Sequence, residues 1–331
     1  MKFLQMPHLE GSSDESINYL LSFSVQLLVS SSMAHFLVFL SFFLLAVEAC
    51  HAALPADLYW NSVLPNTPMP SAIHDMTRPG VFGGEKGDKS DVRLGWRRAD
   101  TVWGKAVTKG QIQDPSVTNF FLEKDLHPGA KMTLHFIRTI TGATLLPRQV
   151  ADSIPFSSAK LPEILSRLSI TPNSIEAKAM KMTLQDCEEP AIDGETKYCA
   201  TSVEAMVDFS TSSLGTRDVQ ALSTAVDREG TPKQVYSISK VQKQPSSKVV
   251  FCHGENYAYA VFYCHTIRAE TYKVSMVGKD GTKVEAVAAC HTDTSGFNPE
   301  HVAFKVLNVK PGTVPICHSL PQSDIVWTPK K

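Results

Sequence analysis

Four cysteines in the C-terminal part of the chain are each followed directly by a histidine. These pairs are separated by 10, 24 and 25 residues and are Cys252-His253, Cys264-His265, Cys290-His291 and Cys317-His318. Neighbouring residues on a β-strand point to opposite faces of a sheet, so one pair cannot present both side chains to a single metal ion. The pattern therefore predicts a division of labour, with cysteines on a packed face and histidines converging on the other.

The N-terminal region contains an apolar run at residues 36–47 (FLVFLSFFLLAV). The run is too short to span a bilayer and has the length of a signal-peptide core, so we expect no stable transmembrane span. Small residues follow it, and cleavage is expected after Ala52. We interpret Met33 as the functional start, residues 33–52 as a signal peptide and residues 1–32 as an upstream extension. The alternative is a genuine long N-terminal region or an uncleaved anchor.

The cysteine count fits export. Of seven cysteines, Cys50 would leave with the signal peptide, and the even number that remains can pair as disulfides. Six cysteines allow fifteen pairings, and the sequence does not choose among them. Only the pairing of Cys187 with Cys199 is favoured, because Pro190 and Gly194 make the segment between them a loop. The expected disulfide-forming residues are Cys187, Cys199, Cys252, Cys264, Cys290 and Cys317.

The histidines of the four pairs are candidate ligands for copper or zinc, since both ions accept neutral imidazole. A thiolate zinc knuckle is disfavoured, because its cysteines are usually about two to four residues apart and exported thiols tend to be oxidised. The alternative is that these histidines only cap backbone groups or line the surface. The candidate ligands are His253, His265, His291 and His318.

Other polar residues receive simpler interpretations. His127, His135 and His301 lie outside the pattern and are expected to be surface or packing residues. The acidic trio Glu188, Glu189 and Glu195 could form a carboxylate site, but a solvated turn is the preferred interpretation. No Ser-His-Asp set, phosphate-binding loop or pair of catalytic carboxylates emerges, so no catalytic residue is indicated.

Composition and charge limit the partners and the domain organisation. The chain has 32 Lys and Arg against 33 Asp and Glu, with no basic block, so nucleic acid is not an expected partner. Residues 53–70 contain four prolines and are predicted to be an extended leader peptide. This leader and the flexible linker that is predicted to follow it make up residues 53–118.

A single folded domain is predicted for residues 119–329, with helices in its first half and antiparallel strands after them. This order indicates an α+β domain stapled by disulfides. Helices are expected at residues 160–168, 173–186, 200–209 and 217–224. Strands are expected at residues 131–137, 248–253, 257–266, 271–277, 283–290 and 302–309, with a hairpin turn at Asp280-Gly281.

The spacing CH-x10-CH-x24-CH-x25-CH resembles the motif of the BURP-domain family of secreted plant proteins. Other stretches are similar to the family too, namely Phe120-Phe121-Leu122, Cys187-Glu188, KYCATS at residues 197–202 and Val326-Trp327. Residues 53–70 resemble the short segment that follows the signal peptide in family members. The linker lacks the repeats rich in Gly, Val and Lys of the dehydration-responsive branch, so the chain looks more like the simpler seed and embryo-type members.

The resemblance implies secretion to the apoplast or cell wall, and the alternative location is the storage vacuole. It implies a non-catalytic protein that binds a cell-wall component or a secreted protein or peptide, with a role in development, seeds or stress. The alternative is a copper-dependent oxidative macrocyclase that crosslinks Trp or Tyr side chains of peptides, with copper held by the histidines. Self-modification is disfavoured, because the segments around Trp96 and Trp103 lack the Gln that begins such core peptides.

Overall fold

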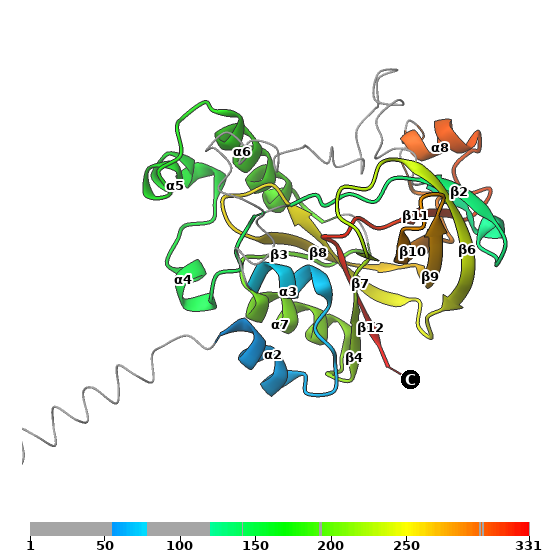
Figure 1. Cartoon of the computed structure of the whole chain (residues 1–331). Coiled ribbons are helices and arrows are strands. Elements are labelled where there is room, and N and C mark those ends of the chain that lie inside the picture. The colour runs from blue at the N-terminus through cyan, green and yellow to red at the C-terminus, as the bar shows by residue number, and fades with distance from the viewer. Residues whose placement is uncertain are drawn as a thin grey trace, which may run out of the picture. The chain divides into compact units, whose positions relative to one another are not determined.

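The computed structural model describes residues 55–77, 120–140, 142–191, 194–297, 299 and 301–330. These residues form two antiparallel β-sheets with helices around them (Figure 1), which confirms the predicted α+β class. The predicted signal peptide, the extension before it, and the linker with Trp96 and Trp103 lie outside the described residues. None of the described helices is long and apolar enough to cross a membrane.

The larger sheet has, within the described chain, the strand order β1-β11-β10-β9-β6-β2, and β5 pairs with β10. Its strands are β1 (Phe120–Leu122), β2 (Lys131–Leu134), β5 (Ala225–Val226), β6 (Gln234–Lys243), β9 (Glu270–Gly278), β10 (Lys283–His291) and β11 (Ile316–Ser319). The predicted turn joins β9 to β10, where Gly281 adopts a φ of +87° that favours glycine. One face of this sheet encloses a core that includes Tyr236, Met276 and Cys290.

The smaller sheet has the order β3-β8-β7-β12-β4. Its strands are β3 (Lys197–Ala200), β4 (Val219–Leu222), β7 (Lys248–Glu255), β8 (Val261–Arg268) and β12 (Ile325–Pro329). Helices α2 (Ala56–Val63), α3 (Ser71–Thr77) and α7 (Val203–Leu214) cover one face (Figure 1), in a core that includes Trp60, Cys252 and Trp327.

The other face of the smaller sheet packs against the larger sheet. Side chains from both sheets meet in a buried layer, here called the inter-sheet core, whose members are Leu222, Val249, Phe251, Ala269, Val287, Ala289, Leu320 and Val326. Because side chains alternate along a strand, Phe251 faces this layer while its neighbour Cys252 faces the helices.

Three helices flank the β3 and β8 end of the smaller sheet (Figure 1), namely α4 (Arg148–Asp152), α5 (Leu161–Arg167) and α6 (Ile175–Glu188). The predicted helices at residues 160–168 and 173–186 are confirmed as α5 and α6. Ser174 caps α6 by accepting a hydrogen bond from the backbone N–H of Ala177, which satisfies a donor that the first helical turn leaves unpaired.

The leader prediction was wrong for its described part. Residues 53–70 were expected to be extended, but α2 forms there, and Trp60 and Leu64 are buried in the core of the smaller sheet. Helix α3 follows directly and adds Ile73 to the same core. The prolines permit this because Pro55 immediately precedes α2 and Pro70 immediately precedes α3, where a missing N–H breaks no helical hydrogen bond. The leader is therefore part of the folded unit.

Two further elements differ from their predictions. Residues 217–224 were expected to be helical, but β4 forms there because Val219–Leu222 pairs with β12. Residues 302–309 were expected to be a strand, but α8 (Val302–Leu307) forms, and Asn308 ends it with a φ of +53°. Short apolar runs fit either state, so the packing partners decide between them.

Candidate metal centre

The cysteines of the Cys-His pairs lie directly opposite one another across neighbouring strands. Cys252 is the register partner of Cys264 on β7 and β8, and Cys290 is the register partner of Cys317 on β10 and β11. Both pairs are disulfide-bonded and fully buried, with Cα atoms 3.9 Å apart in each. The structure also links Cys187 to Cys199, the pair that the loop between them favoured.

The histidines point to the opposite faces, which are the faces that the two sheets turn toward each other. His253 lies two residues beyond Phe251 of the inter-sheet core, and His291 lies two residues beyond Ala289. His318 is the register partner of Ala289. The predicted division is therefore present, with cysteines turned away from the space between the sheets and histidines turned toward it.

His253 and His265 form the first pair, with their Nε2 atoms 3.3 Å apart. The Nδ1 atom of His253 lies 2.7 Å from Asp324, and the Nδ1 atom of His265 lies 2.7 Å from Glu195. An ionised carboxylate only accepts hydrogen bonds, so each ring carries a proton on Nδ1. The two Nε2 lone pairs then face each other and are available to a shared proton or a metal ion.

The pKa values within this first pair agree with one shared cation. Burial lowers the pKa of His253, but the charge and hydrogen bond of Asp324 outweigh it and raise the pKa overall. Burial lowers the pKa of His265, and the positive charge on His253 lowers it further. The two shifts are opposite in direction, so His253 binds a proton more readily than His265 does.

Asp324 and Glu195 are held in place by the fold. Asp324 directly precedes β12 and is buried, and its second oxygen accepts a hydrogen bond from the backbone N–H of Gly254. Glu195 lies in the loop closed by the disulfide between Cys187 and Cys199. Nearby, burial raises the pKa of Glu255 to about 7, despite the opposing charge of His253.

His291 and His318 form the second pair, with their Nε2 atoms 3.4 Å apart and their rings stacked. Burial lowers the pKa of His318 to about 3, and the charge on His253 adds to this effect. Burial and then the charge on His318 lower the pKa of His291 well below its ordinary value. Both rings are therefore neutral at physiological pH, which is the form that binds metals.

The donor atoms fit a metal ion within each pair. Two imidazole nitrogens that bind one ion at about 2.0–2.1 Å lie no more than about 4.2 Å apart, and both pairs satisfy this limit. In the described part of the chain, no group of three or more His, Cys, Asp or Glu side chains is already arranged to hold one ion. Each pair therefore offers two ligands.

The sequence missed Asp324 and assigned Glu195 to a solvated turn. Asp324 directly precedes the apolar Ile325-Val326-Trp327 strand, but its burial and its contact with His253 appear only in the folded structure. The acidic trio does not act as one site, because Glu188 accepts hydrogen bonds from Ser157 and Ser158 instead. His127 is exposed, and His301 is buried, caps α8 and packs on Phe120.

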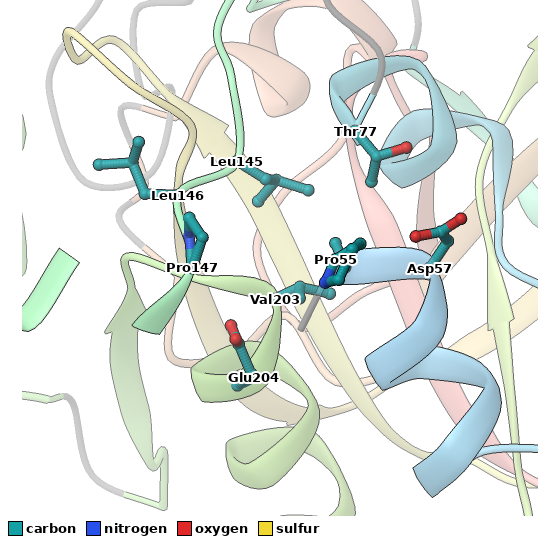
Figure 2. A pocket seen from close by; sticks show the side chains of 9 residues that line it. Pro55, Asp57, Thr77, Leu145, Leu146, Pro147, Val203 and Glu204 are labelled. Atoms are coloured by element: carbon teal, nitrogen blue, oxygen red, sulfur yellow. The ribbon is translucent and has the colours of Figure 1, made fainter. Parts of the chain in front are cut away.

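A separate hollow of about 350 Å³ lies where α2, α3 and α7 come together. Figure 2 shows the carboxylates of Asp57 and Glu204 on different sides of an otherwise largely apolar lining. One Glu204 oxygen accepts a hydrogen bond from the backbone N–H of Arg148. None of its lining residues is a histidine of the two pairs, so this hollow is distinct from the candidate metal centre.

Comparisons with known proteins cover most of the chain. The profile of the BURP domain matches residues 119–329. BURP domain-containing protein 5 of Oryza sativa subsp. japonica is 46% identical over 289 residues, which cover 84% of this chain and 88% of that protein. BURP domain-containing protein 3 of the same plant is 57% identical over 236 residues, and the match spans 70% of this chain but 55% of that protein. BURP domain protein RD22 of Arabidopsis thaliana is 47% identical over 233 residues, 68% of this chain and 59% of that protein.

Proposed function

The chain belongs to the BURP-domain family of plants, and from this premise we propose that it is an exported, non-catalytic copper-binding protein of the cell wall. Within this proposal, His253 with His265 and His291 with His318 hold the metal. A role in development, seeds or stress follows from the resemblance to other family members.

The observation that carries the proposal is the paired arrangement of imidazoles, each pair with facing Nε2 atoms. In the first pair, Asp324 and Glu195 occupy the other ring nitrogens. Metal-binding histidines usually donate their second N–H to a carboxylate in this way, which fixes the tautomer and raises ligand basicity. Imidazole ligands suit copper, which would supply a redox-active centre when bound.

Two features support export to an oxidising compartment. The cross-strand disulfides are integral to the buried cores, and such bonds persist in secreted proteins. The apolar run at residues 36–47 has the length of a signal-peptide core. Both support entry into the secretory route, whose proposed end point for this protein is the cell wall or apoplast.

The copper assignment is tested by electron paramagnetic resonance of the purified protein titrated with Cu(II). We expect a nitrogen-rich signal, because imidazole nitrogens are the ligands that each pair presents. Replacing all four histidines by alanine should remove that signal. If the spectrum of this variant matches that of the unmodified protein, the histidine pairs are not the copper site.

Two further variants refine this test. Asp324→Asn and Glu195→Gln remove the carboxylates that orient the first pair, and we expect Cu(II) affinity to fall about 10- to 100-fold. His127→Ala is the matched control, because His127 is exposed and lies outside the pairs. An equal effect of all three substitutions would show non-specific surface binding.

The non-catalytic part of the proposal competes with oxidative peptide crosslinking. One observation favours crosslinking: the side chains of His253 and His265 are 19% and 13% exposed, which leaves part of each ring open to an external peptide. We expect peptides that span Trp96 and Trp103 to keep their intact masses after incubation with the protein, copper and dioxygen. Loss of two hydrogens from either peptide, detected by mass spectrometry, would establish cyclase activity and overturn this part.

A further inference from the structure

The face of the larger sheet that carries Val287 and Ala289 of the inter-sheet core also has an exposed part, and a cluster of lysines lies there that plays no part in the candidate metal centre. Four adjacent strands each contribute one lysine, and the set, called here the lysine face, is Lys131 on β2, Lys240 on β6, Lys273 on β9 and Lys283 on β10. Lys131, Lys240 and Lys283 are exposed, and Lys273 is partly exposed. Residues adjacent to them in sequence, such as Met132, Val274 and Val284, point to the buried core on the other face.

Strand register fixes the relative positions of these lysines. Lys131, Ser237, Val277 and Lys283 are successive register partners and form one row across the sheet. Neighbouring strands are about 4.8 Å apart, so the two lysines of this row are separated by roughly 14 Å. Lys240 is the partner of Ser275, which places it diagonally from Lys273, at roughly 7–8 Å. The positive charges are therefore spread over a broad surface.

The charge balance of this face differs from that of the whole chain. The whole chain has 32 basic and 33 acidic residues. On this face, the described strand positions hold four lysines and one carboxylate, that of Glu285. Glu285 accepts a hydrogen bond from Ser275. At the margin, Asp227 and Asp280 accept backbone hydrogen bonds, and Lys279 adds a further positive charge. None of the ion pairs formed among the described residues includes a lysine of the face.

Ordinary sheet architecture does not account for these lysines. Lysine at a sheet edge blocks aggregation, but β6, β9 and β10 are interior strands of the sheet. Lysine is also depleted in strands, and like charges on neighbouring strands repel each other. A bound polyanion would relieve that repulsion.

We propose that the lysine face binds a linear polysaccharide that carries carboxylates, a polyuronate. Lysines provide separated point charges for carboxylates, and the hydroxyls of Thr133, Ser237 and Ser275 lie among them for hydrogen bonds to sugar hydroxyls. The described strand positions of this face contain no arginine for bidentate phosphate binding and no exposed aromatic ring for base stacking. This proposal names the wall component in the proposed function and rests on that function only for the cellular setting.

The test measures binding of the full-length protein to de-esterified polygalacturonate and to the same polymer fully methyl-esterified. We expect binding to the charged polymer at low ionic strength, with affinity that falls as salt rises, because salt screens exposed charges. The combined variant K131Q, K240Q, K273Q, K283Q should bind about tenfold or more weakly. The matched control is K178Q, K181Q, K248Q, K310Q, which removes the same charge from exposed positions elsewhere and should bind like the unmodified protein.

Three results would overturn the proposal. These are equal binding to the methyl-esterified polymer, equal weakening by the two lysine variants, and tighter binding to single-stranded DNA or to vesicles of an anionic phospholipid than to polygalacturonate. The variant with all four metal-centre histidines replaced separates the two proposals, because its polymer binding should be unchanged while its copper signal is lost. Far-UV circular dichroism verifies that each variant is folded.

Discussion

Replacing Trp60 by alanine is expected to lower the free energy of unfolding by about 3–5 kcal/mol, the range for deletion of a large buried aromatic side chain. Trp60 on α2 is fully buried, and its ring centroid lies 5.3 Å from that of Trp327 on β12. Its Nε1 atom donates a 2.7 Å hydrogen bond to the backbone oxygen of Thr67, which would lose its partner as well. Chemical denaturation followed by far-UV circular dichroism measures the change.

Leu58→Ala is the control, because Leu58 lies on the same helix but is 54% exposed. Its effect should stay within about 0.5 kcal/mol, as for most surface substitutions. A similarly small effect of Trp60→Ala would mean that α2 only rests against the domain. The expected difference would instead establish the leader as a structural part of the fold.

The second large effect is expected from the double substitution C252A, C264A. Loss of a disulfide that closes a loop of this length lowers stability by about 3 kcal/mol, and truncation of two fully buried side chains adds to it. Copper affinity should fall too, because the disulfide holds β7 and β8 in the register that brings His253 to His265. Urea unfolding and Cu(II) titration of the same preparation measure both effects.

The double substitution C187A, C199A is a matched control, since both disulfides have a sequence separation of 12. The entropic part of the stability loss should therefore be equal. Copper affinity should fall less, because this variant leaves β7 and β8 linked and loosens only the loop that carries Glu195. Copper binding that is weaker in this variant than in C252A, C264A would contradict the proposed role of the cross-strand disulfide.

Local patterns were sufficient to predict strands β2, β7, β8, β9 and β10 and the opposite orientation of cysteines and histidines. Apolar alternation and the Asp280-Gly281 turn predict β9 and β10, and residues 173–186 contain most of α6 behind its Ser174 cap. The two faces of each Cys-His pair follow from strand geometry alone. These features depend on residues that are neighbours in sequence.

Features that depend on distant segments could not be predicted in the same way. Trp60 and Trp327 meet across most of the chain, and such packing between distant segments helps to stabilise α2 in the proline-containing leader. Strand pairing selects one of the fifteen possible disulfide connectivities. Asp324 reaches His253 because β12 lies beside β7, and no local pattern around either residue predicts this contact.

The direct opposition of Cys252 and Cys264 also has a consequence for how the metal centre is assembled. A slip of β7 against β8 by one residue would turn every side chain of the slipped strand to the other face, so the two thiols could no longer meet. The disulfide is therefore compatible only with the register in which His253 and His265 face each other. Under the proposed function, an oxidising environment is therefore a condition for assembling a metal centre that contains no sulfur ligand.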